Sequence, residues 1–210
     1  GAIHLMGLVS DGGVHSSLDH LFAIIDLLKR ENFPGDRVFV HAITDGRDTS
    51  PNGGLGYVAQ VQQKLEQADI GRIATICGRF YAMDRDKRWD RTEKAWDAYT
   101  LSIADVATDA ESAIEQSYAA GITDEFLLPR VIINHGEPLG RIRDGDVVVW
   151  FNFRADRARQ FCRALTQPGF DGFARKASPK VTLVTMTQYA QDIPAQVAYA
   201  PQSLKNTLGE

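Results

Sequence analysis

The sequence predicts an α/β fold, a three-layer α/β/α domain over residues 1–210 with a mostly parallel sheet. Two observations support this prediction. Short apolar runs alternate with stretches in which apolar residues recur at helical spacing. Four of the apolar runs also end in a polar cluster rich in Gly, Asp and Arg, and each cluster precedes a helix-like stretch. Strands that alternate with helices in this way are typical of a parallel sheet covered on both faces.

Two strand and helix pairs are expected at the start of the chain. Residues 3–9 form a near-continuous apolar run, the pattern of a strand buried on both faces. Residues 17–32 then repeat apolar side chains at helical spacing. Residues 38–43 give the second strand, and residues 54–69 place apolar side chains on one face of the second helix.

A third strand and two helices are expected in the middle of the chain. Residues 73–77 form the strand, and residues 91–103 and 109–120 read as the helices. Residues 126–133 contain Pro129, which has no backbone N–H to donate to a sheet. We therefore expect an irregular element or an edge strand there.

The last part of the chain predicts two further strands, at residues 147–151 and 181–187. Between them, Asn152 is expected to cap a helix over residues 153–166. Residues 201–208 look like a helix start that is cut short. We therefore expect the chain to be a piece of a longer protein.

The four polar clusters are expected to lie together, because the carboxyl ends of parallel strands meet at one edge of a sheet. Open α/β sheets bind their ligands at that edge. The clusters cover residues 10–16, 44–49, 78–86 and 152–157. They contain five arginines with aspartates and a histidine between them, which suits a small acid that carries phosphate or carboxylate.

Composition excludes several classes of protein. The net charge of −4 and the pI of about 5.7 argue against nucleic-acid binding. The 16 arginines against 7 lysines favour planar recognition of anions. No apolar run approaches the roughly 18 residues of a membrane span and no signal segment opens the chain, so a cytoplasmic protein is expected. Cys77 and Cys162 lack paired spacing and are expected to be buried thiols.

The first two clusters each allow more than one interpretation. Asp11 and His15 have the spacing of a metal-ligand pair, but a catalytic metal needs a third ligand, so His15 is expected to face a ligand or to sit in a plain turn. Arg47 and Asp48 form either a surface turn closed by an internal ion pair, or a donor fork beside a carboxylate that holds or deprotonates a substrate hydroxyl.

The third cluster alternates charges of opposite sign. Arg79 and Arg85 are nearest the strand end and are expected to contact a ligand, whereas Arg88 and Arg91 enter the next helix and are expected to form salt bridges.

The fourth cluster places Arg154 and Arg157 one helical turn apart. On the first turn of a helix, both side chains and the free backbone amides would favour an anion. The remaining histidines lack a partner signature and are assigned structural roles; they are His4, His20, His41 and His135.

These motifs resemble the inserted substrate-binding domain of the cofactor-independent (2,3-bisphosphoglycerate-independent) phosphoglycerate mutases. The matching segments are LVSDGGVHS at 8–16, DGRDT at 45–49, GRFYAMDRD at 78–86, RWDR at 88–91 and FNFRADR at 151–157. The resemblance implies a two-domain isomerase of glycolysis and gluconeogenesis, in which this domain is inserted into a metal-binding phosphatase-like domain of the same polypeptide. That other domain is absent from this chain, and the parent is expected to be a monomer.

The resemblance also implies a reaction. In this family 3-phosphoglycerate gives its phosphoryl group to a serine on the metal domain, beside two divalent ions, usually manganese. The glycerate is held, shifts, and takes the phosphoryl group back on its other hydroxyl to give 2-phosphoglycerate. This chain would carry no cofactor and no metal. It contains no Asp-Ser-Gly nucleophile motif, so the isolated chain is expected to be inactive.

The resemblance assigns roles to residues that match the motifs. Arg154 and Arg157 would bind the phosphoryl group as it passes between the domains, and Asp48 would handle the hydroxyl protons as the catalytic residue. The full set of implied substrate contacts is His15, Arg47, Asp48, Arg79, Arg85, Arg154 and Arg157.

Two other functions compete with this interpretation. The first is a metallohydrolase that uses Asp11, His15, Asp45 and Asp48. The second is a binding or scaffold module in which the Arg and Asp loops only brace one another.

Overall fold

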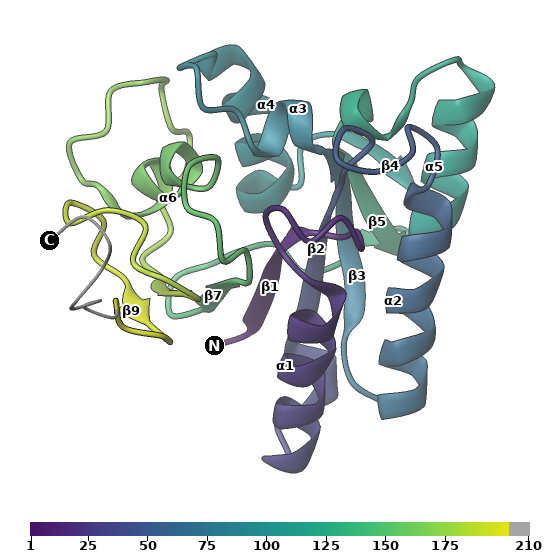
Figure 1. Ribbon diagram of the computed structural model, residues 1–210, viewed down its shortest axis with the longest axis horizontal. Coiled ribbons are helices and arrows are strands. Elements are labelled where there is room, and N and C mark those ends of the chain that lie inside the picture. Colours follow the sequence, from purple (N-terminus) through teal and green to yellow (C-terminus); the bar gives the residue numbers. More distant parts are fainter. Residues whose placement is uncertain (202–210) are drawn as a thin grey trace, which may run out of the picture.

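The computed structural model describes residues 1–201, and Figure 1 shows its elements around a central sheet. Within these residues the strands are β1 (Ile3–Leu8), β2 (Val38–Thr44), β3 (Arg72–Gly78), β4 (Asp105–Ala107), β5 (Arg130–Asn134), β6 (Glu137–Pro138), β7 (Val147–Trp150), β8 (Thr182–Thr185) and β9 (Gln196–Val197). The helices are α1 (Leu18–Arg30), α2 (Gly54–Ala68), α3 (Arg79–Ala82), α4 (Trp89–Leu101), α5 (Ala110–Ala119) and α6 (Arg159–Thr166). Two short 3-10 turns are η1 (Gly35–Arg37) and η2 (Asp124–Phe126).

The sheet confirms the predicted α/β class. Its strand order is β4-β5-β3-β2-β1-β7-β8-β9, with β6 paired to β5. The five strands expected from the sequence are β1, β2, β3, β7 and β8, and they pair with one another only in parallel. The side chains of α1, α2 and α5 bury one face of the sheet, and those of α4 and α6 bury the other. The result is three layers, as predicted.

Local signals explain where several helices begin. The Ser17 side chain accepts a hydrogen bond from the Asp19 amide at the start of α1, and Asp109 accepts one from the Ser112 amide at the start of α5. Each helix then buries one apolar stripe against the sheet. No helix within residues 1–201 has the length and apolar character needed to cross a membrane.

The expectation of an irregular or edge element at residues 126–133 holds for residues 127–129, which form no regular element, but is wrong for residues 130–133, which belong to β5. β5 lies inside the sheet, because it pairs antiparallel with β3 and parallel with β4, which forms the edge. Pro129 immediately precedes β5, so its missing N–H removes no hydrogen bond from the strand. The short strand β4 was not predicted, since three residues carry too little pattern.

The expected helix over residues 153–166 begins later, at Arg159. Asn152 does not cap it, because its Oδ1 accepts a hydrogen bond from the Leu8 amide. The amides of Phe153 and Arg154 donate to the His15 carbonyl instead of lying free. Arg154 and Arg157 therefore lie in the turn before α6, and the argument from a helix N-terminus does not apply to them.

Two of the histidines assigned structural roles form a buried chain of hydrogen bonds across three strands. Asp146 lies 3.2 Å from His4 Nε2, His4 Nδ1 lies 2.9 Å from His41 Nε2, and His41 Nδ1 lies 2.8 Å from the Thr75 hydroxyl. With both rings neutral, each Nε2 carries a proton and Thr75 donates to His41. Burial lowers the pKa of His4 and lowers that of His41 well below its usual value.

Cys77 and Cys162 are free and buried, as predicted, and burial raises the pKa of each thiol. The helix start expected at residues 201–208 lies outside the described residues, apart from Pro201.

Candidate functional site

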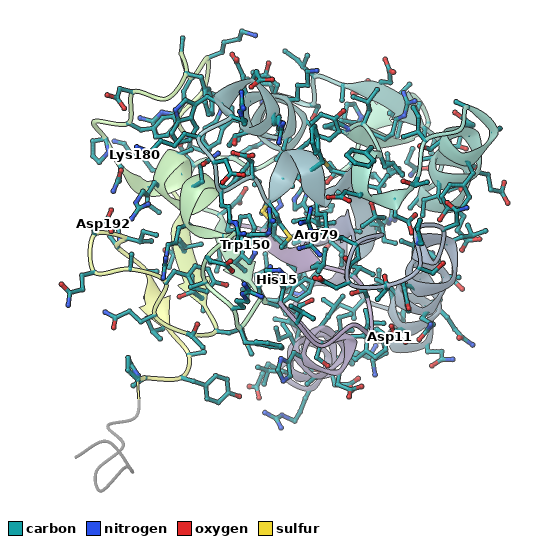
Figure 2. The ribbon with its side chains drawn as sticks, turned by 45° about the horizontal axis from the view of Figure 1, so that its top comes forward. Asp11, His15, Arg79, Trp150, Lys180 and Asp192 are labelled. Atoms are coloured by element: carbon teal, nitrogen blue, oxygen red, sulfur yellow. The ribbon has the colours of Figure 1, made fainter. Side chains whose placement is uncertain are left out.

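The four polar clusters lie at one edge of the sheet, as expected. Each follows the carboxyl end of β1, β2, β3 or β7, and these four strands are adjacent and parallel. Figure 2 shows His15, from the first cluster, near Arg79, from the third. The topology therefore brings side chains from distant parts of the sequence to one place.

Arg79 is the most buried arginine of this edge. It is the first residue of α3 and its side chain is 2 % exposed. Its Nη1 donates to Asp45 Oδ1 and to Asp48 Oδ2, each at 2.6 Å, and its Nη2 lies 3.0 Å from His15 Nε2. One guanidinium thus joins the loops that follow β1, β2 and β3.

The contact with Arg79 fixes the protonation of His15. A guanidinium can only donate, so the neutral imidazole accepts at Nε2 and carries its proton on Nδ1. His15 is 2 % exposed. Burial, helped by the positive charge of Arg79, lowers the pKa of His15 to about 4. The imidazole is consequently neutral near pH 7.

Asp45 organises the second cluster. Its Oδ1 accepts hydrogen bonds from the amides of Arg47 and Asp48, and its Oδ2 accepts one from the Ser10 hydroxyl at 2.7 Å. Burial opposes its ionisation, but the hydrogen bonds from the Asp48 amide, Ser10 and Arg79 outweigh burial and lower the pKa of Asp45. The turn is closed by this carboxylate, not by an ion pair between Arg47 and Asp48.

Gly78 explains how Arg47 reaches its partner. Its amide donates to the Leu127 carbonyl at 2.7 Å, and a Cβ at this position would collide with the carbonyl oxygens of Asp124 and Glu125. Glycine therefore lets η2 pack against the end of β3. Glu125 of η2 then lies 3.3 Å from Arg47 Nη1.

Asp156 is shared by two arginines of different clusters. Its Oδ2 accepts from Arg85 Nη1 at 2.7 Å and from Arg154 Nη2 at 3.1 Å, and its Oδ1 lies 2.9 Å from Arg154 Nε. His15 Nδ1 lies 3.7 Å from the same Oδ1, too far for a hydrogen bond. Burial opposes its ionisation, but the interactions with Arg85, Arg154 and His15 lower the pKa of Asp156.

A cavity of about 280 Å³ opens beside these groups. It is lined by five arginines, three acidic residues and two phenylalanines: Arg47, Arg79, Arg85, Arg91, Arg157, Asp84, Asp86, Glu125, Phe80 and Phe126. The cavity is therefore strongly polar, with positive charge in excess.

Arg157 differs from the other arginines of the cavity. Its Nη1 donates to the Met83 carbonyl at 3.2 Å, and it forms no ion pair with a carboxylate of residues 1–201. Burial, together with the positive charges of Arg79, Arg85 and Arg47, lowers the pKa of Arg157. This half-buried guanidinium therefore lies among other positive charges and keeps N–H donors that can bind a ligand.

The predicted site residues are gathered to different degrees. Four line the cavity, namely Arg47, Arg79, Arg85 and Arg157. His15 and Asp48 contact Arg79 but are not part of the lining. Arg154 is outside the lining and connects to it through Asp156. Arg91 forms the expected salt bridge, at 3.3 Å from Asp84, whereas Arg88 forms none within residues 1–201.

The metal interpretation of the first two clusters has no support in the described part of the chain. No group of three or more His, Cys, Asp or Glu side chains there is arranged to hold a metal ion. Asp11 accepts a hydrogen bond from the Tyr57 hydroxyl, and His15 is occupied by Arg79.

Sequence reasoning missed two acidic residues that hold arginines of the site. Asp156 is inside the fourth cluster between Arg154 and Arg157, so its sequence pattern indicates only a local ion pair. Glu125 is in η2, outside every cluster, and no sequence signal connects it to Arg47.

Comparisons with known proteins match this chain to one family. Residues 1–191 match the family described as BPG-independent PGAM N-terminus. The 2,3-bisphosphoglycerate-independent phosphoglycerate mutase of Moorella thermoacetica is 53 % identical over 211 residues, covering 100 % of this chain and 41 % of that protein. The protein of the same name from Symbiobacterium thermophilum is 56 % identical, covering 100 % of this chain and 40 % of that protein.

A solved structure has the same fold. A crystal structure of Leishmania mexicana phosphoglycerate mutase at low cobalt concentration superposes with a TM-score of 0.91 at 32 % identity, covering 98 % of this chain and 39 % of that one. The chain thus spans about two fifths of the length of these relatives.

Proposed function

Since this chain belongs to the BPG-independent phosphoglycerate mutase N-terminal family, we propose that it is the substrate-holding domain of an enzyme that interconverts 3-phosphoglycerate and 2-phosphoglycerate. Its ligand is a phosphoglycerate, and its partner is the remaining part of the same polypeptide. In this proposal residues 1–210 form one domain, and the chain holds the glycerate part while the phosphoryl group is transferred elsewhere.

The observation that carries the proposal is the unpaired guanidinium of Arg157. Every other arginine in the cavity lining has a carboxylate within 4 Å, whereas Arg157 has none among the described residues. Burial and the positive charges of the neighbouring arginines lower the pKa of Arg157, and an anion placed beside it relieves the repulsion between these like charges. A phosphate or carboxylate oxygen is the group that a planar guanidinium binds in two-point fashion.

The other residues divide between fixed and adjustable contacts. Arg79 is held by Asp45 and Asp48 and provides a rigid wall. Arg47 is 57 % exposed and Arg85 is 44 % exposed, so each side chain can turn toward a ligand at small cost. Holding the glycerate in one geometry favours return of the phosphoryl group to a hydroxyl of the same molecule.

Asp48 is the residue we assign to proton handling. Its Oδ2 accepts from Arg79, and its side chain is 21 % exposed at the edge of the site. A carboxylate that keeps one oxygen free can accept the proton of a substrate hydroxyl. His15 is neutral and its Nε2 is engaged by Arg79, so we assign it an orienting contact through Nδ1.

The nucleophile and the metal ions of the proposed enzyme belong to the rest of the polypeptide. The described residues do not fit a two-metal centre, since no group of candidate ligands converges there. We therefore assign no step of the transfer chemistry to this chain beyond holding, orienting and proton handling.

Calorimetric titration of the chain with 3-phosphoglycerate tests the proposal. We expect saturable binding that Arg157→Ala weakens at least tenfold. Arg30→Ala is the matched control, because it removes the same charge from an exposed position at the end of α1. Absence of binding by the wild-type chain would instead favour a module whose loops only brace one another.

A further inference from the structure

We propose that the Asp156 carboxylate occupies, in the ligand-free protein, the place of an anionic group of the ligand, and that it limits the affinity of the site for phosphorylated acids. The inference rests on the proposed function, because it concerns the same arginines. It makes Asp156 a residue that sets ligand affinity and not a contact of the substrate.

The geometry of Asp156 is that of a bound anion. Its two oxygens contact Arg85 from the loop after β3 and Arg154 from the loop after β7, at 2.7 to 3.1 Å. His15, from the loop after β1, points Nδ1 at the same carboxylate from 3.7 Å. Three of the residues expected to contact a ligand thus converge on one internal carboxylate.

The contact between His15 and Asp156 is incomplete. Within residues 1–201, the buried His15 Nδ1 has no hydrogen-bond partner, and the buried Asp156 Oδ1 has only the ion-pair contact with Arg154 Nε at 2.9 Å, which lacks hydrogen-bond geometry. Native proteins rarely leave such groups unpaired, and an exception points to a missing ligand or water. A phosphate or carboxylate oxygen placed between the arginines and His15 would accept the Nδ1 proton that Asp156 does not reach.

A ligand anion can replace Asp156 as the partner of Arg85 and Arg154, because both ion pairs are exposed to solvent. Arg85 and Arg154 are 44 % and 46 % exposed, so their pairs with Asp156 are screened by solvent. Arg79 differs from these two arginines, because it is buried together with Asp45 and cannot leave this partner to bind a ligand anion. A ligand anion can therefore take over Arg85 and Arg154 while Arg79 keeps the loops in place.

Removing the negative charge of Asp156 would have two opposite effects on the affinity for an anionic ligand. Asp156 holds two long side chains near the site, which lowers the entropy cost of binding, but it also repels any anion that approaches the same donors. Because the ion pairs of Asp156 are exposed, they restrict the two arginine side chains only weakly. The repulsion between Asp156 and the ligand, in contrast, acts on every negative charge of the ligand. We expect repulsion to dominate, and to do so more for a ligand of higher charge.

The test is calorimetric titration of the complete 210-residue chain and its Asp156→Asn variant with 3-phosphoglycerate and with glycerate. We expect the variant to bind 3-phosphoglycerate about tenfold more tightly, a change of about 1.4 kcal/mol, and glycerate less than threefold more tightly. The matched control is Asp192→Asn, which removes an equally charged partner of Arg163 at a site distant from His15 and Arg79 (Figure 2).

The outcomes separate this inference from the proposed function. Unchanged or weaker binding of 3-phosphoglycerate by the variant, with normal binding by the wild type, overturns the inference alone. Binding by neither protein overturns both. Binding by the variant only supports the inference, because the carboxylate then blocks the site, but it overturns the proposed function for the wild-type chain.

A measurement on the wild-type chain covers the case of a variant that does not fold. Carbon-13 NMR of the Asp156 carboxyl group gives its pKa with and without saturating 3-phosphoglycerate. We expect the ligand to raise this pKa, because the carboxylate loses Arg85 and Arg154 and gains an anionic neighbour. A pKa that falls or stays constant contradicts the exchange.

Discussion

Arg79 and His15 are joined by a contact of 3.0 Å between Nη2 and Nε2, which links the loop after β3 to the loop after β1. The same guanidinium binds Asp45 and Asp48 from the loop after β2. A single buried charge thus sets the relative positions of three loops. Removing the Arg79 guanidinium would leave the charge of Asp45, which is only 1 % exposed, buried without its partner and would therefore destabilise the fold.

We therefore predict that Arg79→Met lowers the free energy of unfolding by about 3–5 kcal/mol, the usual cost of leaving one partner of a buried pair alone. Urea denaturation at pH 7.5 measures this. Arg85→Met serves as the control, because its pair with Asp156 is partly exposed and contributes less than about 1 kcal/mol. Equal losses in the two variants would mean that Asp45 does not depend on Arg79.

A second prediction concerns the pH dependence of stability. Burial lowers the pKa of His4, His15 and His41 in the folded chain. Between about pH 6.5 and pH 4 the unfolded chain therefore binds more protons than the folded one, and stability decreases as the pH falls. Each pKa unit corresponds to about 1.4 kcal/mol.

Urea denaturation at intervals from pH 7.5 to pH 5 measures this decrease. His135→Gln should leave the slope unchanged, because His135 lies in an exposed turn. His41→Gln should reduce the slope even though it also lowers stability at pH 7.5. A flat profile in the wild-type chain would show that folding does not lower the pKa of the buried histidines.

Sequence reasoning located the five parallel core strands and the edge that carries the candidate site, because both depend on local patterns. The apolar run at 3–9 and the cluster at 10–16 are each contiguous, and parallel pairing then fixes where the cluster lies. The start of α6 was not predictable in this way. Asn152 is a good capping residue by type, but its side chain is taken by Leu8, which is 144 positions away.

The roles of the acidic residues were hidden for the same reason. A carboxylate between two arginines in sequence, such as Asp156, has the pattern of a local ion pair. Its connection to Arg85 exists only because β3 and β7 end at the same edge. Glu125 reaches Arg47 only because Gly78 lets η2 pack closely on β3.

A third prediction applies to the complete enzyme that we propose. Arg154→Ala should lower its turnover at least tenfold, since a donor that stabilises developing charge contributes about 2.7–4 kcal/mol. Steady-state conversion of 3-phosphoglycerate measures the effect, with Arg30→Ala as the control of equal charge. An unchanged rate would count against any role of Arg154 beyond its ion pair with Asp156.

The last prediction separates holding a substrate from transforming it. We expect the 210-residue chain to bind 3-phosphoglycerate without producing 2-phosphoglycerate, even with added manganese. Phosphoryl transfer through a covalent intermediate needs an activated nucleophile. The sequence has no Asp-Ser-Gly motif, and residues 1–201 hold no group of candidate metal ligands.

An assay for 2-phosphoglycerate at high protein concentration tests this expectation, and metal analysis after dialysis against manganese should find no stoichiometric ion. If product forms, its source is either this chain or a contaminating mutase, and the Asp48→Asn variant helps to distinguish them. Activity lost in Asp48→Asn would belong to this chain and would contradict the division of labour proposed here. Activity that persists unchanged in that variant would come from a contaminating mutase, or it would contradict the assignment of proton handling to Asp48.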